Sequence, residues 1–296
     1  MIIDIHTHPL FLEMLQEMPP PAESDDKSQV FDLIADPSAI GMAAGLTSKN
    51  YYGRGPGILS LVDFKHQMEN AGIDIVAFQV ALIKGDPVRQ INEQVADLLN
   101  KFSDSFIGFA GFDPNTGEQA VADIEYAVKE LGFKGIKTVS ALMGLDINDK
   151  AYYPSYAKAQ ELGVPIMIHT GTGLIMGSRV KHVHPLMVDD VAFDFPNLKI
   201  ICAHLGAWNY MDVHGMLVRH PNVYADLSFW PLNPHYINLV PWGLFEETVP
   251  DKILLGSDYP AGQSPTEAME AVKGLPISED FRRKILGDNA ASLLGI

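Results

Sequence analysis

Met1-Ile-Ile-Asp-Ile-His6-Thr-His8-Pro9 is the stretch of sequence that decides the fold. Its short apolar run is typical of a strand buried in a parallel sheet. An open doubly wound sheet usually places a glycine-rich turn after its first strand, whereas this strand ends in His-Thr-His-Pro. His6 and His8 alternate along the end of the strand, so both side chains point to the same face. The stretch therefore predicts a first barrel strand whose end presents two imidazoles.

Further apolar runs follow at intervals, each bounded by Gly, Pro, Asn or Asp. With the first, they are residues 2–6, 73–80, 106–112, 133–139, 164–168, 198–203, 223–227 and 253–256. Stretches with helical spacing of apolar residues separate most of them, notably 58–71, 88–102, 118–131, 153–162 and 185–195. Eight such runs alternating with helices predict an α/β fold, a parallel eight-stranded (β/α)8 TIM barrel, with residues 1–296 as a single domain.

Two long connections interrupt this alternation. Residues 9–57 form an extended insertion after the first strand, and residues 170–184 follow the fifth. Long connections in a compact domain tend to be functional. Because loops that follow barrel strands all open on the C-terminal face, both connections are expected to border the active site.

Polar residues follow several of the apolar runs directly. His169 ends the fifth run, His204 the sixth and Asp258 the eighth. A polar residue at the C-terminal end of a barrel strand is typical of catalysis, although a hydrogen-bonded structural histidine is the usual explanation for any one of them. His6 and His8, about 7 Å apart along the strand, can converge on one ion, and neutral imidazole suits Zn, Fe or Mn. The set as a whole favours a metal site at the barrel mouth.

These strand ends resemble the amidohydrolase superfamily, and more narrowly its amidohydrolase-related branch, which is aminocarboxymuconate-semialdehyde decarboxylase-like and also includes resorcylate decarboxylases. The resemblance rests on Asp4-Ile-His6-Thr-His8-Pro9, His169, His204 and Gly256-Ser-Asp258-Tyr-Pro260, with support from Gly132-Phe-Lys-Gly-Ile-Lys137, Ala203-His-Leu-Gly206 and Lys284-Ile-Leu-Gly-Asp-Asn-Ala290. It runs from residue 1 to about residue 294 and is weakest across residues 9–57.

The resemblance implies a ligand set and two catalytic residues. His6, His8, His169 and Asp258 would bind one divalent metal ion, zinc before manganese or iron. Asp258 would also be catalytic, together with His204. Binuclear relatives use a carboxylated lysine after the fourth strand, so the place of Lys137 leaves a second metal ion open.

Three functions remain compatible with this site. Hydrolysis of a small, carboxylate-bearing substrate by metal-activated water demands least beyond the site itself. Non-oxidative decarboxylation, catalysed by a carboxy-lyase, would use the same mononuclear metal. A metal-binding scaffold without catalysis is the third alternative, although none of the five expected positions is missing.

Basic and aromatic residues in the strand-end loops are candidates for substrate contact. Arg54, Arg179 and Lys181 can pair with a carboxylate, and Trp208 can wall an apolar pocket. Each of them also fits an ordinary solvated surface or simple packing.

The formal net charge is −16 at pH 7, which argues against nucleic acid and anionic membranes as partners. Cys202 is the single cysteine, so no intrachain disulfide forms, as in a reducing compartment. Neither a signal peptide nor a membrane-spanning stretch is evident, and a cytoplasmic location is expected. The partner is expected to be a small carboxylate, with a homodimer as a further possibility.

Overall fold

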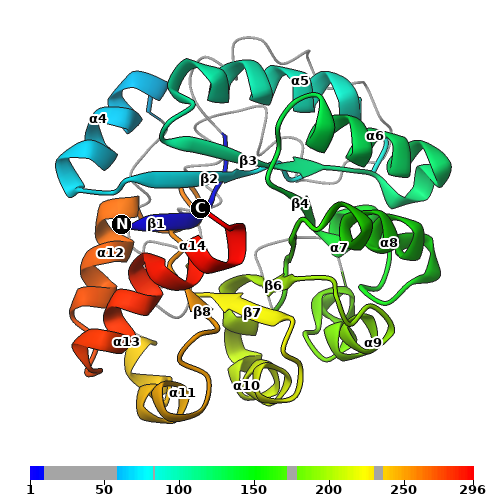
Figure 1. Ribbon diagram of the computed structural model, residues 1–296. Coiled ribbons are helices and arrows are strands. Elements are labelled where there is room, and N and C mark those ends of the chain that lie inside the picture. Colours follow the sequence, from blue (N-terminus) through cyan, green and yellow to red (C-terminus); the bar gives the residue numbers. More distant parts are fainter. Residues whose placement is uncertain (10–58, 83, 172–178, 230–235) are drawn as a thin grey trace.

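The computed structural model describes residues 1–9, 59–82, 84–171, 179–229 and 236–296. Eight parallel strands follow one another around the sheet in the order β1 to β8, and helices lie outside them (Figure 1). The eight strands are β1 (Ile3–Thr7), β2 (Ile75–Gln79), β3 (Phe106–Gly111), β4 (Gly135–Thr138), β5 (Ile166–Ile168), β6 (Ile200–Cys202), β7 (Val223–Asp226) and β8 (Ile253–Leu254). The predicted (β/α)8 barrel is confirmed.

The described α-helices alternate with these strands. They are α4 (Leu61–Ala71), α5 (Val88–Leu99), α6 (Glu118–Lys129), α7 (Ser140–Met143), α8 (Tyr153–Leu162), α9 (Met187–Asp194), α10 (Tyr210–Arg219), α11 (Trp242–Thr248), α12 (Pro265–Lys273), α13 (Glu279–Arg283) and α14 (Asn289–Leu294). Each apolar run of the sequence overlaps one strand, with β1 ending one residue beyond its run, and each amphipathic stretch contains one α-helix. The insertion expected after the first strand falls, apart from Pro9, on residues outside the described ones.

The barrel closes where the first strand meets the segment after the eighth. The amide of Ile5 donates to the carbonyl of Leu255 at 2.9 Å, and the amide of Asp258 donates to the carbonyl of His6 at 2.7 Å. Thr7 and Tyr259 form a parallel bridge further along. These hydrogen bonds place the residues after β8 beside the end of β1, so Asp258 lies next to the two N-terminal histidines.

The barrel interior is a packed core rather than a channel. Side chains that point inwards from the strands, such as Ile5, Phe109 and Met167, form one buried cluster with Ala290 and Leu293 of α14. The last helix therefore closes one end of the barrel (Figure 1). The candidate catalytic residues lie at the opposite end of the barrel, at the C-terminal ends of the strands, as in other barrels.

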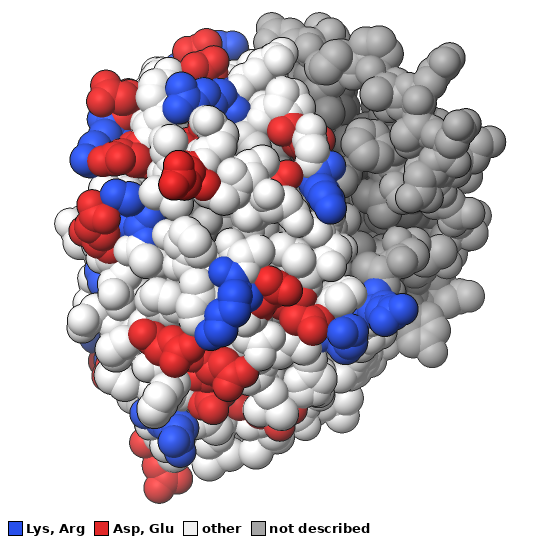
Figure 2. All heavy atoms as spheres, turned by 90° about the vertical axis from the view of Figure 1, so that its right-hand side faces the viewer, with Lys and Arg blue, Asp and Glu red and all other residues white. Residues whose placement is uncertain are grey.

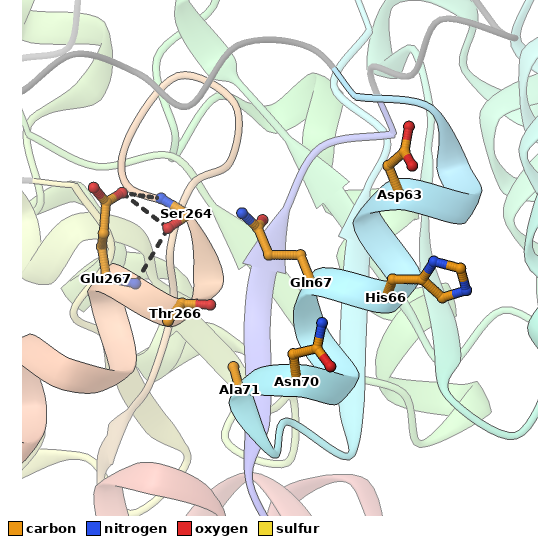
Figure 3. Close-up of a pocket in the computed structure, with 8 residues that line it drawn as sticks. All are labelled: Asp63, His66, Gln67, Asn70, Ala71, Ser264, Thr266 and Glu267. Carbon is orange, nitrogen blue, oxygen red and sulfur yellow. Dashed lines mark hydrogen bonds between the residues drawn. The ribbon is translucent and has the colours of Figure 1, made fainter.

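A polar groove lies outside the barrel between α4 and α12. Its volume is about 590 Å³, and Gln67 points from α4 towards the first turn of α12 (Figure 3). That turn is fixed by a capping box, since the Ser264 hydroxyl accepts from the Glu267 amide and the Glu267 carboxylate accepts from the Ser264 amide. None of the strand-end histidines lines this groove, so it is separate from the site described below.

Charged side chains are interspersed on the face that carries α6 and α8 (Figure 2). Lys129 pairs with Glu125 within α6, and Lys158 of α8 reaches Glu125 at 3.8 Å. This face therefore combines both signs despite the net negative charge of the chain. Among the described helices, none has both the length and the hydropathy required to cross a bilayer.

Candidate metal centre

Three of the strand-end residues bring one donor atom each to a common point. Within the described residues, atoms of His6, His8 and Asp258 lie within 4.8 Å of one another. Asp258 Oδ1 is 3.0 Å from His8 Nε2 and 3.5 Å from His6 Nε2. His6 is fully buried, whereas the side chains of His8 and Asp258 keep 18% and 11% of their exposure, so the cluster opens towards solvent on one side.

The other ring nitrogen of each histidine already has an acceptor. His8 Nδ1 lies 2.9 Å from the carbonyl oxygen of Gln79, and His6 Nδ1 lies 3.0 Å from Asp226 Oδ2. Both Nδ1 atoms therefore carry the proton, which leaves the Nε2 lone pairs facing the carboxylate of Asp258. Lone pairs that converge in this way repel one another unless a cation lies between them. The residues present therefore fit a divalent metal ion.

His169 and His204 lie beside this cluster. His204 Nε2 is 3.1 Å from His169 Nδ1, and the two rings meet edge to face at a centroid distance of 4.8 Å. His169 Nε2 is buried and has no hydrogen-bond partner among the described residues. An unpaired nitrogen in this setting is costly, and a metal ion would satisfy it. His169 thus has a free donor atom, although it is not part of the three-residue group.

Burial keeps His6, His169 and His204 neutral. It lowers the pKa of His6 to about 3, with help from the nearby charge of Lys137. Burial also lowers the pKa of His204, and it lowers the pKa of His169 well below its ordinary value. Burial alone would raise the pKa of Asp258, but hydrogen bonding with His8 and the positive charge of the surrounding rings when they are protonated hold that pKa below the usual range. Neutral imidazoles and an ionised carboxylate are the forms that bind metal.

Asp4 connects the first strand of the barrel to the segment that follows the last strand. Its Oδ1 accepts from the backbone amides of His6 and Ser257, each at 3.1 Å. Burial raises the pKa of Asp4 to about 7. The acidic residue of the N-terminal motif therefore has a structural role in holding the ends of β1 and β8 in register.

Unusual backbone conformations occur at two of these strand ends. His204 has φ 60° and Asp258 has φ 58°. Residues other than glycine rarely adopt positive φ, and such strain gathers at functional sites. In the segment after β6, Leu205 and Ala207 continue the pattern with φ 49° and 51°.

Gly171→Ala is expected to destabilise the protein by about 2–5 kcal/mol. Gly171 has φ +81°, and a Cβ there would lie 2.3 Å from the carbonyl oxygen of Gly206, which cannot move without shifting the segment that carries His204. Urea denaturation measures the free energy of unfolding. Gly163→Ala is the matched control, because Gly163 has φ +70° with nothing within 4 Å of its Cβ position. Equal losses in the two variants would show that the backbone contact has no role.

Lys137 lies inside the site rather than on the surface. It belongs to β4, is 1% exposed, and its Nζ is 3.4 Å from His6 Nε2. Burial lowers the pKa of its ammonium group to about 8, against the opposing effect of Asp226 and Asp258. The side chain is therefore well placed to act on the metal centre, and carboxylation stays open.

The structure does not bring the described residues predicted to contact substrate together at the strand-end histidines. Lys181 pairs with Asp146 at 3.2 Å rather than with a strand-end histidine. Arg179 is exposed, and Trp208 is 47% exposed with its ring 4.5 Å from that of Tyr236. Arg54 lies outside the described residues. Their contact with a substrate therefore stays a prediction.

Sequence reasoning missed Asp226 and Ser228 at the end of β7. Asp226 is fully buried against His6, and the Ser228 hydroxyl is 2.8 Å from His204 Nδ1. Asp226 is the last residue of its strand and follows an apolar run, so the criterion that selected His169 and Asp258 also fits it.

Curated relatives align with most of this chain. The 2-amino-3-carboxymuconate-6-semialdehyde decarboxylase of Dictyostelium discoideum is 25% identical over 248 residues, which is 71% of this chain and 67% of the relative. The gamma-resorcylate decarboxylase of Rhodococcus jostii is 23% identical over 257 residues, covering 70% and 76%.

Solved structures with the same fold include two decarboxylases. The 5-carboxyvanillate decarboxylase of Sphingomonas paucimobilis has a TM-score of 0.70 at 17% identity, covering 100% of this chain and 99% of that one. A dihydroxybenzoic acid decarboxylase from a Polaromonas species, solved with bound manganese and the inhibitor 2-nitroresorcinol, has a TM-score of 0.66 at 20% identity, covering 99% and 96%. The amidohydrolase family model matches residues 3–296. The chain therefore belongs to the amidohydrolase family.

Proposed function

We propose that this protein is a metal-dependent, non-oxidative decarboxylase of a small carboxylic acid. The observation that carries the metal dependence is the convergence of His6 Nε2, His8 Nε2 and Asp258 Oδ1 at the mouth of the barrel. The relatives that align over about 70% of the chain are decarboxylases, which supports the same reaction class.

Hydrolysis, the first expectation from the sequence, is less well supported than decarboxylation. The donor set alone suits either reaction, since both use a cation beside a bound carboxylate or carbonyl group. The named relatives favour loss of carbon dioxide. A scaffold without catalysis has no observation in its favour, because His6, His8, His169, His204 and Asp258 are all present and buried or nearly so.

His6, His8, His169 and Asp258 would hold the ion. When bound, a divalent metal would supply positive charge to orient the substrate and to stabilise the negative charge that develops as the carbon–carbon bond breaks. Three imidazoles and one carboxylate suit zinc, manganese and iron. Zinc is the expectation from the sequence, whereas the Polaromonas relative was solved with manganese, so manganese is an equal candidate.

Decarboxylation needs one proton, which comes from water and is transferred by a group of the protein. The bond between the substrate carbon and its carboxylate breaks, the electron pair stays on that carbon, carbon dioxide leaves, and a proton takes its place. Asp258 is the better placed of the two catalytic candidates, because its side chain is still 11% exposed beside His8. Both ring nitrogens of His204 are engaged, by Ser228 and by His169. We therefore assign proton transfer to Asp258, whose ionised carboxylate would take up a proton from water and deliver it to the substrate carbon, and orientation to His204.

The substrate class is a small aromatic or unsaturated carboxylic acid, by analogy with the named relatives.

Decarboxylase activity is tested with 2,6-dihydroxybenzoate and 5-carboxyvanillate in deuterated water, with the protein loaded with Mn²⁺ or Zn²⁺. The expected result is release of carbon dioxide and one deuterium on the product carbon that lost the carboxylate. A parallel panel of lactones and amides tests hydrolysis. Turnover of that panel, without carbon dioxide release from any carboxylic acid tried, would contradict the proposal.

A further inference from the structure

Asp226 stands at the start of a chain of hydrogen bonds that reaches three histidines. Its carboxylate is fully buried at the end of β7. Oδ1 accepts from the backbone amides of His204 at 3.1 Å and of Ser228 at 2.9 Å, and also from the Ser228 hydroxyl. Oδ2 faces His6 Nδ1 at 3.0 Å. Three donors at Oδ1 and an imidazole nitrogen at Oδ2 are the partners of an ionised carboxylate, which only accepts hydrogen bonds.

The direction of each hydrogen bond follows from that ionised carboxylate. A carboxylate only accepts, so the proton between Asp226 and His6 is on His6 Nδ1. His6 Nε2 is then unprotonated, 3.5 Å from Asp258 Oδ1 and 3.4 Å from Lys137 Nζ. The Ser228 hydroxyl donates its one proton to Asp226. Its oxygen must therefore accept the hydrogen bond from His204 Nδ1, at 2.8 Å.

The same reasoning extends one residue further. With its proton on Nδ1, His204 has a lone pair on Nε2, which faces His169 Nδ1 at 3.1 Å. His169 Nδ1 must donate this hydrogen bond, which leaves His169 Nε2 unprotonated. That atom is the buried nitrogen without a partner among the described residues. The carboxylate of Asp226 thus determines which ring nitrogen is unprotonated in His6 and in His169, two candidate ligands at the ends of different strands.

We propose that Asp226 and Ser228 are positioning residues that fix the tautomers of His6, His204 and His169, so that His6 and His169 present Nε2 to the metal ion. Asp226 acts on His6 directly. It acts on His169 through Ser228 and His204. His8 is independent of this chain, because its Nδ1 faces the carbonyl oxygen of Gln79. The proposal concerns the ligands alone and holds whichever reaction the site catalyses.

Asp226→Asn is the direct test, because an amide cannot satisfy both sides of the carboxylate. Two backbone amides point at Oδ1, so the asparagine must turn its oxygen towards them and its NH₂ group towards His6. His6 Nδ1 must then accept, which moves the ring proton to Nε2 and blocks that donor atom. The affinity for Zn²⁺ and Mn²⁺, measured by competition with a chelator, is expected to fall about 10–100-fold.

Nitrogen-15 NMR of histidine-labelled, metal-free protein reads the tautomers themselves. In the wild type, His6, His204 and His169 are expected to carry the proton on Nδ1. In Asp226→Asn, His6 is expected to carry it on Nε2, while His8 stays unchanged as an internal reference. Asp123→Asn is the matched control, since Asp123 is also a buried carboxylate, bound by Arg89 and Gln119 away from the histidines. It should alter neither the tautomers nor the metal affinity.

Ser228→Ala separates the chain of hydrogen bonds from general damage. It removes the acceptor of His204 Nδ1 and the 3.1 Å contact of the Ser228 hydroxyl with His6 Nδ1, but it keeps the carboxylate of Asp226 against His6 Nδ1. The His204 and His169 signals are therefore expected to change while His6 keeps its proton on Nδ1. Wild-type protein with Nε2 protonated on His6 or His169 would overturn the proposal even if neither variant folds. So would an Asp226→Asn variant whose tautomers and metal affinity match those of the wild type.

Discussion

Asp258→Asn is expected to lower kcat on the order of 10³-fold or more while the protein keeps much of its metal. Asparagine retains the shape of the side chain and one oxygen, and three imidazoles remain as ligands, so binding of the ion is weakened rather than abolished. The amide cannot accept or donate the catalytic proton, and turnover is lost for that reason. Metal content and kcat are measured on the same preparation.

The control for this variant is Asp251→Asn. Asp251 is an exposed carboxylate whose side chain is 72% accessible and pairs with Lys284, so its replacement should leave kcat and metal content unchanged. Normal turnover by Asp258→Asn would contradict the assignment of proton transfer to Asp258. Loss of metal in proportion to activity would instead make Asp258 a ligand with no separate catalytic role.

Removal of the metal with a chelator is expected to abolish turnover and to lower the melting temperature. The apo site leaves the Nε2 atoms of His6 and His8 facing the carboxylate of Asp258 within 3.5 Å. A bound ion relieves this repulsion and stabilises the folded state, by roughly 2.7 kcal/mol when free metal is 100-fold above its Kd. Both activity and melting temperature should return on addition of Zn²⁺ or Mn²⁺, and the metal that restores the higher kcat identifies the better cofactor.

The His8→Ala variant is the control for chelation. It lacks one ligand, so added metal should stabilise it less than the wild type. Full activity after complete removal of metal, verified by elemental analysis, would contradict a metal-dependent reaction.

The barrel could be predicted from sequence because its signal is local. Each strand is a short apolar run with a polar residue after it, and each outer helix shows its own periodicity. The strand at residues 166–168 and the helix at 153–162 both lie within their predicted ranges. Helix α7, which lies between β4 and α8, has only four residues. A helix this short shows no periodic pattern of apolar residues, so the sequence did not predict it. That residues 1–296 form a single domain stays a prediction.

The convergence of three candidate ligands could also be predicted, because the C-terminal ends of parallel strands meet on one face of a barrel, whereas the ligand set itself stays a prediction. His6, His8 and Asp258 come together although Asp258 is separated from them by almost the whole chain. The pairing of His204 with His169 could not be predicted from sequence. The His204 backbone has a positive φ, which a histidine residue does not indicate in advance. The ion pair of Lys181 with Asp146 could not be predicted either, because the two residues are 35 positions apart in different loops.

Elemental analysis of the purified, untagged protein is the measurement that tests the central claim most directly, alongside His6→Ala and His169→Ala. About one equivalent of zinc, manganese or iron in the wild type, lost in both variants, is the expected result. About two equivalents would assign Lys137 as a carboxylated ligand to a second ion and would favour hydrolysis. A wild-type protein that binds no metal after reconstitution with Zn²⁺ or Mn²⁺, or variants that bind as much as the wild type, would contradict the metal centre proposed at the mouth of this barrel.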